Sequence, residues 1–294
     1  MKTKDFSGVI TPMITPFKQG RIDSNAIGRL VDFLLKSKVS GLFPAGSTGC
    51  FPFLTAEQHV SLLREVAEYI SGKTLFLPGV GRNSFTETVY VAKNAEKLGA
   101  DAIVVVTPYY IKLDDRSLLN YFDKVADSTK SSIILYNIPQ FTGTRISAEV
   151  AATLAKRHGN VIGIKDSSGG FRSISEMLRL APEGFLVFQG QDDLLLPSLR
   201  IGASGGVCGT TNFSSLAVKV YKEYKAGRLE KAMALQSRLT QLMHVLKGAT
   251  FPLAYNYLFN RIVASRNATG AIEPFDELSL EEKERLYSSA RKLV

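Results

Sequence analysis

The chain has 294 residues, of which 45% are hydrophobic and 21% are charged, a composition typical of a globular protein with a sizeable core. Its net charge is +9, but it has no run of five like charges and no interleaving of aromatic and basic residues, which argues against a nucleic-acid partner. The longest apolar runs are too short to cross a bilayer, and residues 1–5 show no secretory signal, so we expect a cytoplasmic protein with no membrane segment.

Eight short apolar runs follow one another along the chain, and each leads through a polar or glycine-rich turn into a helical pattern. The runs cover residues 8–14, 41–45, 74–77, 102–106, 132–135, 161–164, 185–188 and 205–208. They are apolar throughout and do not alternate, as expected for parallel strands that helices cover. Ser24 is expected to cap a helix at 24–38, and Thr55 forms a capping box with Gln58 for the next helix.

Eight such units predict a (β/α)8 barrel. An open, doubly wound sheet is the structural alternative, but it calls for a glycine-rich fingerprint after the first strand, and Thr11-Pro12-Met13-Ile14 is not one. After Phe213 the chain is helical in period, at 217–226, 230–246, 253–264 and 280–293. We therefore expect a barrel over residues 1–228 and a C-terminal helical extension over 229–294. No flexible linker separates them, so the extension should pack on the barrel.

Polar residues gather at one end of the predicted strands. In a (β/α)8 barrel the active site is built at the carboxyl ends of the strands. Those ends carry Thr15, Ser47, Thr48, Gly79, Gly81, Tyr110, Tyr136, Lys165, Asp192 and Thr210. Hydroxyl, phenol, amine and carboxylate groups should therefore converge on one mouth. Cys50 and Cys208 lie far apart with no metal-type spacing, and we expect both to be free thiols.

Lys165 ends an apolar strand, where charging an amine is costly. It could attack a substrate carbonyl as a Schiff-base nucleophile, bind an anionic substrate group, or pair with Asp166. Neighbouring residues of a strand point to opposite faces, so we do not expect Lys165 to meet Asp166. A nucleophile needs a neutral amine, and a mouth of apolar and hydroxyl groups favours that form.

Tyr136 ends the preceding strand, and side chains at the ends of neighbouring strands can meet. Its phenol could serve as a general acid and base for a substrate oxygen, or the ring could simply fill the barrel. Ser47 and Thr48 could relay protons or hold a carboxylate. Gly46 and Gly49 would let backbone N–H groups approach that anion, although an ordinary turn explains this sequence equally well.

Four motifs are specific in combination: Gly46-Ser47-Thr48-Gly49, Pro108-Tyr109-Tyr110, Tyr136-Asn137-Ile138-Pro139 and Gly163-Ile164-Lys165-Asp166. Together, and over the whole chain, they resemble the N-acetylneuraminate lyase and dihydrodipicolinate synthase family of class I aldolases. The resemblance implies a (β/α)8 barrel with three C-terminal helices, usually assembled as a homotetramer of tight dimers. It implies no metal and no cofactor, because the chemistry runs through a lysine Schiff base.

The resemblance also assigns roles to individual residues. It makes Lys165 the Schiff-base lysine and Tyr136 the catalytic tyrosine. Ser47 and Thr48 would hold the carboxylate of pyruvate or another small 2-keto acid. Tyr110 would be the relay tyrosine that reaches across a dimer interface.

Three places depart from parts of this family. Phe141 stands where dihydrodipicolinate synthases carry an arginine, and Cys50 follows the G-S-T-G motif where many members have glutamate. The segment Gly190-Gln191-Asp192-Asp193 lies where sugar-acid aldolases place acids and amides for substrate hydroxyls. The whole looks most like the archaeal 2-keto-3-deoxygluconate aldolases.

The expected reaction is therefore the reversible cleavage of 2-keto-3-deoxygluconate to pyruvate and glyceraldehyde. Gly46, Gly190, Asp192, Asp193 and Thr15 are expected to contribute to substrate binding. Lys112 could reach the far end of the substrate, or a phosphate on it, but an exposed lysine is as good an interpretation. The alternatives are dihydrodipicolinate synthase, N-acetylneuraminate lyase, and a non-catalytic binding protein on the same barrel.

Overall fold

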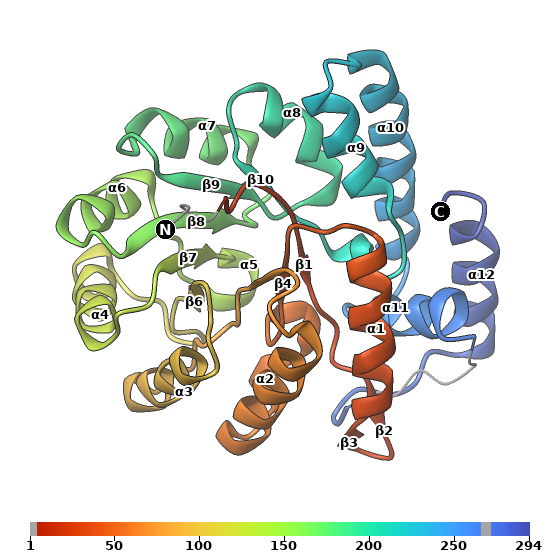
Figure 1. The fold of residues 1–294 in the computed structure, drawn as a ribbon, viewed down its shortest axis with the longest axis horizontal. Helices are drawn as coiled ribbons and strands as arrows, with labels where there is room; N and C mark the ends of the chain where they lie inside the picture. The colour runs from red at the N-terminus through yellow and green to blue at the C-terminus, as the bar shows by residue number, and fades with distance from the viewer. Residues whose placement is uncertain (1–4, 266–271) are drawn as a thin grey trace.

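The computed structural model describes residues 5–265 and 272–294. Eight parallel strands form one curved sheet at the centre of the molecule (Figure 1). The strands are β1 (Gly8–Pro12), β4 (Gly41–Phe43), β5 (Leu75–Phe76), β6 (Ile103–Val106), β7 (Ile133–Asn137), β8 (Val161–Asp166), β9 (Leu186–Gln189) and β10 (Gly205–Val207). Each predicted apolar run overlaps one of these strands; β7, β8 and β9 extend one or two residues past the predicted run, and the other strands lie within theirs.

The sheet closes on itself. Its strand order is β5-β4-β1-β10-β9-β8-β7-β6, so strands that are consecutive among these eight lie side by side. The outer strands meet through a parallel bridge between Gly79 and Val104. The predicted (β/α)8 barrel is thus confirmed. A two-stranded hairpin, β2 (Phe17–Lys18) with β3 (Arg21–Ile22), precedes the first helix and was not predicted.

Helices surround the strands and bury their apolar faces against them (Figure 1). They are α1 (Ser24–Lys36), α2 (Ala56–Ile70), α3 (Phe85–Lys97), α4 (Asp115–Ser128), α6 (Ala148–Arg157), α7 (Phe171–Leu180), α8 (Leu195–Arg200) and α9 (Leu216–Lys225), with the short α5 (Pro139–Thr142) after β7. Among the described helices, none is long and apolar enough to cross a membrane.

The first helices begin at residues whose side chains cap the free backbone N–H groups. Thr55 and Gln58 form the predicted capping box at the start of α2. The prediction for α1 was wrong by one residue: the side chain of Asp23, not Ser24, accepts the N–H of Ala26, and the helix ends at Lys36 instead of residue 38. A carboxylate at this position also complements the positive end of the helix dipole.

Three helices follow the barrel: α10 (Leu229–Leu246), α11 (Leu253–Leu258), which continues into a π-helical turn at Phe259–Val263, and α12 (Leu280–Ala290). In Figure 1 they stand at one side of the barrel, next to α9 and α1. Gln236 of α10 joins them to it, because its amide donates to the carbonyl oxygens of Asp192 and Asp193 and accepts the N–H of Leu196. A boundary at residue 228 stays a prediction.

Candidate active site

Lys165 lies at the carboxyl end of β8 and is only 4% exposed. Its Nζ atom is 3.9 Å from the centre of the Tyr136 ring and 5.1 Å from the centre of the Phe43 ring. The first ring is fixed by register, since Tyr136 of β7 pairs with Lys165. The faces of aromatic rings attract an ammonium group, which offsets part of the cost of burying it.

Lys165 does not meet Asp166. The Oδ1 atom of Asp166 accepts hydrogen bonds from Asn137 Nδ2 at 3.0 Å and from the N–H of Ser168 at 2.8 Å. Lys165 is in none of the ion pairs of residues 5–265 and 272–294. A structural Lys165–Asp166 pair is therefore ruled out, and the buried amine stays available for chemistry.

Ser47 and Tyr136 meet across the mouth of the barrel. The two hydroxyl oxygens are 3.3 Å apart, within hydrogen-bond distance, although the two residues follow different strands. The Tyr136 ring is also held edge-on against Phe43, with ring centres 6.0 Å apart. A phenol fixed beside both an amine and a second hydroxyl can pass a proton between them and a bound molecule.

The Gly46-Ser47-Thr48-Gly49 segment forms a tight 3-10 turn after β4. A side chain at Gly49 would lie 2.8 Å from the carbonyl oxygen of Met13, so only glycine fits there. Thr15 donates its hydroxyl hydrogen to the carbonyl oxygen of Gly49 at 2.7 Å. Thr15 thus stabilises the turn through this hydrogen bond, and it does not line the cavity that is described below. Gly46 lies against the Phe43 ring.

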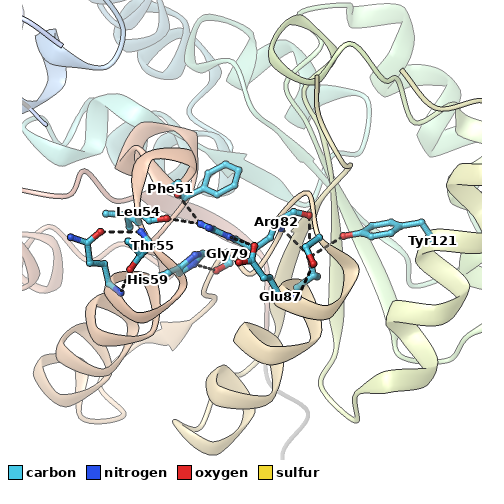
Figure 2. Close-up of polar contacts among 11 residues, drawn as sticks. Phe51, Leu54, Thr55, His59, Gly79, Arg82, Glu87 and Tyr121 are labelled. Carbon is cyan, nitrogen blue, oxygen red and sulfur yellow. Dashed lines mark hydrogen bonds and ion pairs between the residues drawn. The ribbon is translucent and has the colours of Figure 1, made fainter. Parts of the chain in front are cut away.

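Arg82 fastens the segment that follows this turn (Figure 2). Its guanidinium donates to the carbonyl oxygens of Leu54 at 2.8 Å and Phe51 at 3.4 Å, and it forms an ion pair with Glu87. His59 of α2 donates from Nε2 to the carbonyl oxygen of Gly79. The loops after β4 and β5 are therefore locked to each other and to their helices, which gives Ser47 and Thr48 a rigid base.

A cavity of about 320 Å³ opens at this mouth. The barrel contributes Thr48, Tyr136, Lys165, Ser167, Gly190 and Asp192 to its wall. The C-terminal helices and the loop between them contribute Met243, Leu246, Lys247, Phe251 and Tyr255. Four of the predicted strand-end residues, Thr48, Tyr136, Lys165 and Asp192, therefore line one cavity, and the helical extension contributes to its wall as well as packing on the barrel.

A second cavity of about 260 Å³ lies beside the first and is lined mainly by apolar side chains. Phe141 and Phe251 line both cavities, and their rings pack with centres 5.4 Å apart. Ser47 and Cys50 face the second cavity. Burial raises the pKa of the Cys50 thiol to about 12, so this group is a neutral thiol at physiological pH. Both cysteines are free, as predicted.

Asp192 is 2% exposed, and both of its carboxylate oxygens are occupied. Oδ1 accepts the N–H of Gly209, while Oδ2 accepts the N–H and the hydroxyl of Thr210. Burial raises the pKa of Asp192, and these hydrogen bonds oppose the rise. The carboxylate therefore ties the loop after β9 to the loop after β10 and fixes the cavity wall between them.

Six of the predicted site residues do not line the main cavity: Thr15 and Gly46, Ser47, which faces the second cavity, and Tyr110, Lys112 and Asp193. Tyr110 is 93% exposed, with a φ of 80°, and Lys112 is exposed two residues further on. Asp193 does not line the cavity, but its Oδ2 lies 3.6 Å from Nζ of Lys247, which does. Substrate contacts by these residues therefore stay predictions.

Other residues at the cavity were missed from the sequence. Ser167 is 2% exposed, lines the cavity, and its hydroxyl has no hydrogen-bond partner. Its position two residues after Lys165, on the same side of the strand, was the available signal. Lys247, Phe251 and Tyr255 carried no such signal, because helical periodicity does not show which part of the barrel a helix will cover.

No group of three or more histidine, cysteine or acidic side chains is placed to hold a metal ion in residues 5–265 and 272–294. Lys165 and Lys247 are the only cations lining the main cavity in this part of the chain. The groups that line it include the amines of Lys165 and Lys247, the phenols of Tyr136 and Tyr255, hydroxyls and the Asp192 carboxylate.

The whole chain is similar to known enzymes. The sequence model of the Dihydrodipicolinate synthetase family matches residues 5–293. The 2-dehydro-3-deoxy-D-gluconate/2-dehydro-3-deoxy-phosphogluconate aldolase of Picrophilus torridus is 41% identical over 89% of this chain and 97% of its own. The 4-hydroxy-tetrahydrodipicolinate synthase of Archaeoglobus fulgidus is 38% identical over 84% of this chain and 85% of its own.

Solved structures agree with the fold. The 2-keto 3-deoxygluconate aldolase from Picrophilus torridus superposes with a TM-score of 0.89 at 40% identity, covering 93% of this chain and 98% of its own. The barrel and these matches define a pyruvate-dependent carbon–carbon lyase of class I. The chain belongs to the dihydrodipicolinate synthetase family.

Proposed function

We propose that this enzyme is an aldolase that cleaves a 2-keto-3-deoxy sugar acid, 2-keto-3-deoxygluconate, reversibly to pyruvate and glyceraldehyde. The observation that carries the proposal is the buried amine of Lys165, 3.9 Å from the centre of the Tyr136 ring, in a cavity that also holds unused hydroxyl groups. The 41% identical relative from Picrophilus torridus bears the name of an aldolase for this substrate class.

Lys165 starts the reaction by attacking the C2 carbonyl of the substrate. Water leaves, and a protonated imine remains between Nζ and C2. The substrate carboxylate lies at Ser47 and Thr48, where the first N–H groups of the 3-10 turn have no partner within the turn. Carboxylate and amine together hold the first three substrate carbons in a single orientation.

Tyr136 then removes the proton from the C4 hydroxyl. The C3–C4 bond breaks, its electrons move into the protonated imine to form an enamine, and the aldehyde leaves. Protonation of C3 and hydrolysis of the imine release pyruvate and restore the free amine. The hydrogen bond between the Ser47 and Tyr136 hydroxyls gives the phenol a second partner, so the proton need not stay on the tyrosine.

The distal hydroxyls of the substrate extend along the wall formed by the loops after β8 and β9. Ser167 offers an unpaired hydroxyl there, and glycine at position 190 lets this hydroxyl lie against the backbone, because a Cβ atom at residue 190 would lie 2.0 Å from the Ser167 Oγ. Asp192 keeps this wall in place. The Ser167 hydroxyl can donate to or accept from a hydroxyl of a polyhydroxy chain.

Tyr110 joins the site from a second copy of the chain in this proposal. It lines neither cavity of its own chain, and a φ of 80° is strained for a tyrosine, a feature often found at functional positions. Tight dimers that pair into a homotetramer would bring the exposed ring of one copy to the hydroxyl pair of its neighbour.

Trapping with borohydride tests the mechanism. Borohydride with pyruvate should add a reduced three-carbon adduct to the Lys165 peptide of the wild type. The variant Lys165→Met should gain no adduct and lose turnover, whereas the exposed control Lys130→Met should behave as the wild type. An adduct on another lysine, or none, would overturn the imine mechanism.

Turnover then identifies the substrate. Cleavage should be fastest with 2-keto-3-deoxygluconate in a set that includes its galactonate epimer and the phosphorylated form of each. The second candidate is 4-hydroxy-tetrahydrodipicolinate synthase, favoured by the name of the Archaeoglobus fulgidus relative. Two observations argue against the synthase. The apolar Phe141 lines the cavity, and Lys247 is the only lining cation besides Lys165 in the described chain. Faster synthase turnover than aldol cleavage would reverse the choice.

A further inference from the structure

The residues that follow Tyr136 and Lys165 form a second pair on the outer face of the sheet. In the register of β7 and β8, Tyr136 lies opposite Lys165 and Asn137 lies opposite Asp166. Since successive side chains of a strand alternate between faces, the first pair points into the barrel and the second points toward the helices. A change in the contact between Asn137 and Asp166 therefore shifts the backbone that carries Tyr136 and Lys165.

The outer pair is fully enclosed. Asn137 is 0% exposed and Asp166 is 1% exposed. The amide of Asn137 donates to Oδ1 of Asp166 at 3.0 Å, and its Oδ1 accepts the N–H of Ile146 at 2.9 Å. The same Oδ1 of Asp166 accepts the N–H of Ser168 at 2.8 Å. The contact thus joins the ends of two strands and the segments that follow them.

Only half of the Asp166 carboxylate takes part. Its Oδ2 atom has no hydrogen-bond partner in the buried interior. A buried carboxylate that leaves one oxygen unpaired costs desolvation energy, so stability alone is a poor reason to keep it. The atom that is used, Oδ1, is the one that holds Asn137.

We propose that the hydrogen bond between Asn137 and Asp166 is a positioning contact that keeps Tyr136 and Lys165 in reacting geometry. This inference rests on the proposed function, because it assigns work to the amine and the phenol. Without this hydrogen bond, the ends of β7 and β8 can slide or separate. The centre of the Tyr136 ring then no longer lies 3.9 Å from Nζ of Lys165. Neither side chain touches the substrate.

The contact has a kinetic signature of its own. The carboxylate seat at Ser47 and Thr48 follows β4, which does not pair with β7 or β8. Losing the contact should therefore lower kcat, which depends on the amine and the phenol, and change the KM for the 2-keto acid by less than about threefold.

Three variants test the contact at nearly constant shape. Asp166→Asn keeps an oxygen in the place of Oδ1 and should keep kcat within about threefold of the wild type. Asn137→Asp keeps the acceptor for Ile146 but sets two carboxyl groups against each other, and kcat should fall about tenfold or more, equivalent to about 1.4 kcal/mol. The double variant restores a donor and an acceptor, so it should recover most of that loss.

The pH profile separates positioning from a general loss of structure. In Asn137→Asp, protonation of one of the facing carboxyl groups re-creates a hydrogen bond between them. Its kcat relative to the wild type should therefore rise as the pH is lowered. A merely unstable protein would not regain activity in acid.

A matched control lies one strand away. Gln189, at the end of β9, donates to the Ser198 hydroxyl at 2.8 Å in an equally buried setting, without joining β7 to β8. Ser198→Ala should lower stability but change kcat by less than about twofold. It shows what the loss of a buried hydrogen bond near the site does by itself.

The outcomes are distinct. The inference is overturned if Asn137→Asp keeps wild-type kcat, if the double variant recovers nothing, or if Ser198→Ala loses as much kcat as Asn137→Asp. Borohydride labelling of the wild type with pyruvate is run alongside. Labelling at Lys165 with any of those results overturns this inference alone, whereas absent labelling overturns the proposed function and this inference with it.

Discussion

Lys165 lies against two aromatic rings and forms no ion pair with the part of the chain that the structure describes, an arrangement that serves reactivity at the expense of stability. The ring faces of Tyr136 and Phe43 recover part of the desolvation cost of the ammonium, about 2 kcal/mol in a buried setting. In a core with no catalytic role, a buried lysine without an ion-pair partner would only destabilise the fold.

Replacing this lysine should therefore stabilise the fold. Lys165→Met keeps the length and apolar contacts of the side chain and removes the buried charge, so the free energy of unfolding should rise by about 1–2 kcal/mol as activity is lost. Urea denaturation of both proteins measures the difference. The exposed control Lys130→Met should change it by less than about 0.5 kcal/mol, and a destabilised Lys165→Met would contradict this account.

His59 should make stability depend on pH. Burial, opposed by its hydrogen bond to Gly79 and helped by Arg82, lowers its pKa to about 4 from the ordinary 6.5 (Figure 2). Between these values the unfolded chain binds a proton that the folded chain does not, so the free energy of unfolding falls as the pH falls. The loss should total about 3 kcal/mol and be complete near pH 4.

Denaturation midpoints measured at several pH values check this expectation. His59→Gln can keep a donor toward the Gly79 carbonyl but cannot titrate, so it should lose that part of the slope between pH 6.5 and 4. Other groups, such as Asp192, titrate equally in both proteins, and their contribution cancels in the difference. Identical slopes would mean that His59 is not buried in its neutral form.

At the scale of elements, α10 belongs to the active site through Gln236. This 8% exposed amide holds two carbonyl groups of the loop after β9 and the first turn of α8. Gln236→Ala leaves those buried groups unpaired, so the free energy of unfolding should fall by about 3 kcal/mol, and the KM for the sugar acid should rise because Asp192 shifts.

Gln241→Ala on the same helix is the control, since its side chain is exposed. It should change the free energy of unfolding by less than about 0.5 kcal/mol and leave KM unaltered. Urea denaturation and steady-state kinetics on the two variants give both numbers. Equal effects would show that α10 contributes through helix propensity alone.

The strands were predictable because each buried run is short, apolar and followed by a turn, and eight of them in sequence leave few topologies. The hairpin of β2 and β3 was not, since two-residue strands have no period to detect. The proximity of Lys165, Tyr136, Ser47 and Thr48 could be predicted because parallel strands bring their carboxyl ends together. Phe251 and Lys247 were missed because their place depends on how α10 and α11 dock, which only tertiary packing decides.

At the scale of the whole molecule, Tyr110 is expected to act on a neighbouring copy. Lys165→Met and Tyr110→Phe should each be nearly inactive by themselves. After subunit exchange, a mixed dimer has one site with both native groups, so an equal mixture should regain about a quarter of wild-type activity. Activity measured against mixing ratio checks this. A mixture as inactive as its parents would place Tyr110 outside its neighbour's site.

The closure of the barrel between β5 and β6 has a consequence for how ligands protect the enzyme. These strands are joined by one isolated bridge, Gly79 to Val104, and by the hydrogen bond from the N–H of Asp101 to the carbonyl oxygen of Phe76, so we expect the sheet to open at this seam. Ser47 and Thr48 follow the strand next to β5 on one arm of the opened crescent, whereas Tyr136 and Lys165 lie on the other arm. Pyruvate bound covalently to Lys165, with its carboxylate at Ser47 and Thr48, would link the two arms. Hydrogen exchange at the Val80 and Val104 amides, which donate across the seam, should slow when it is bound.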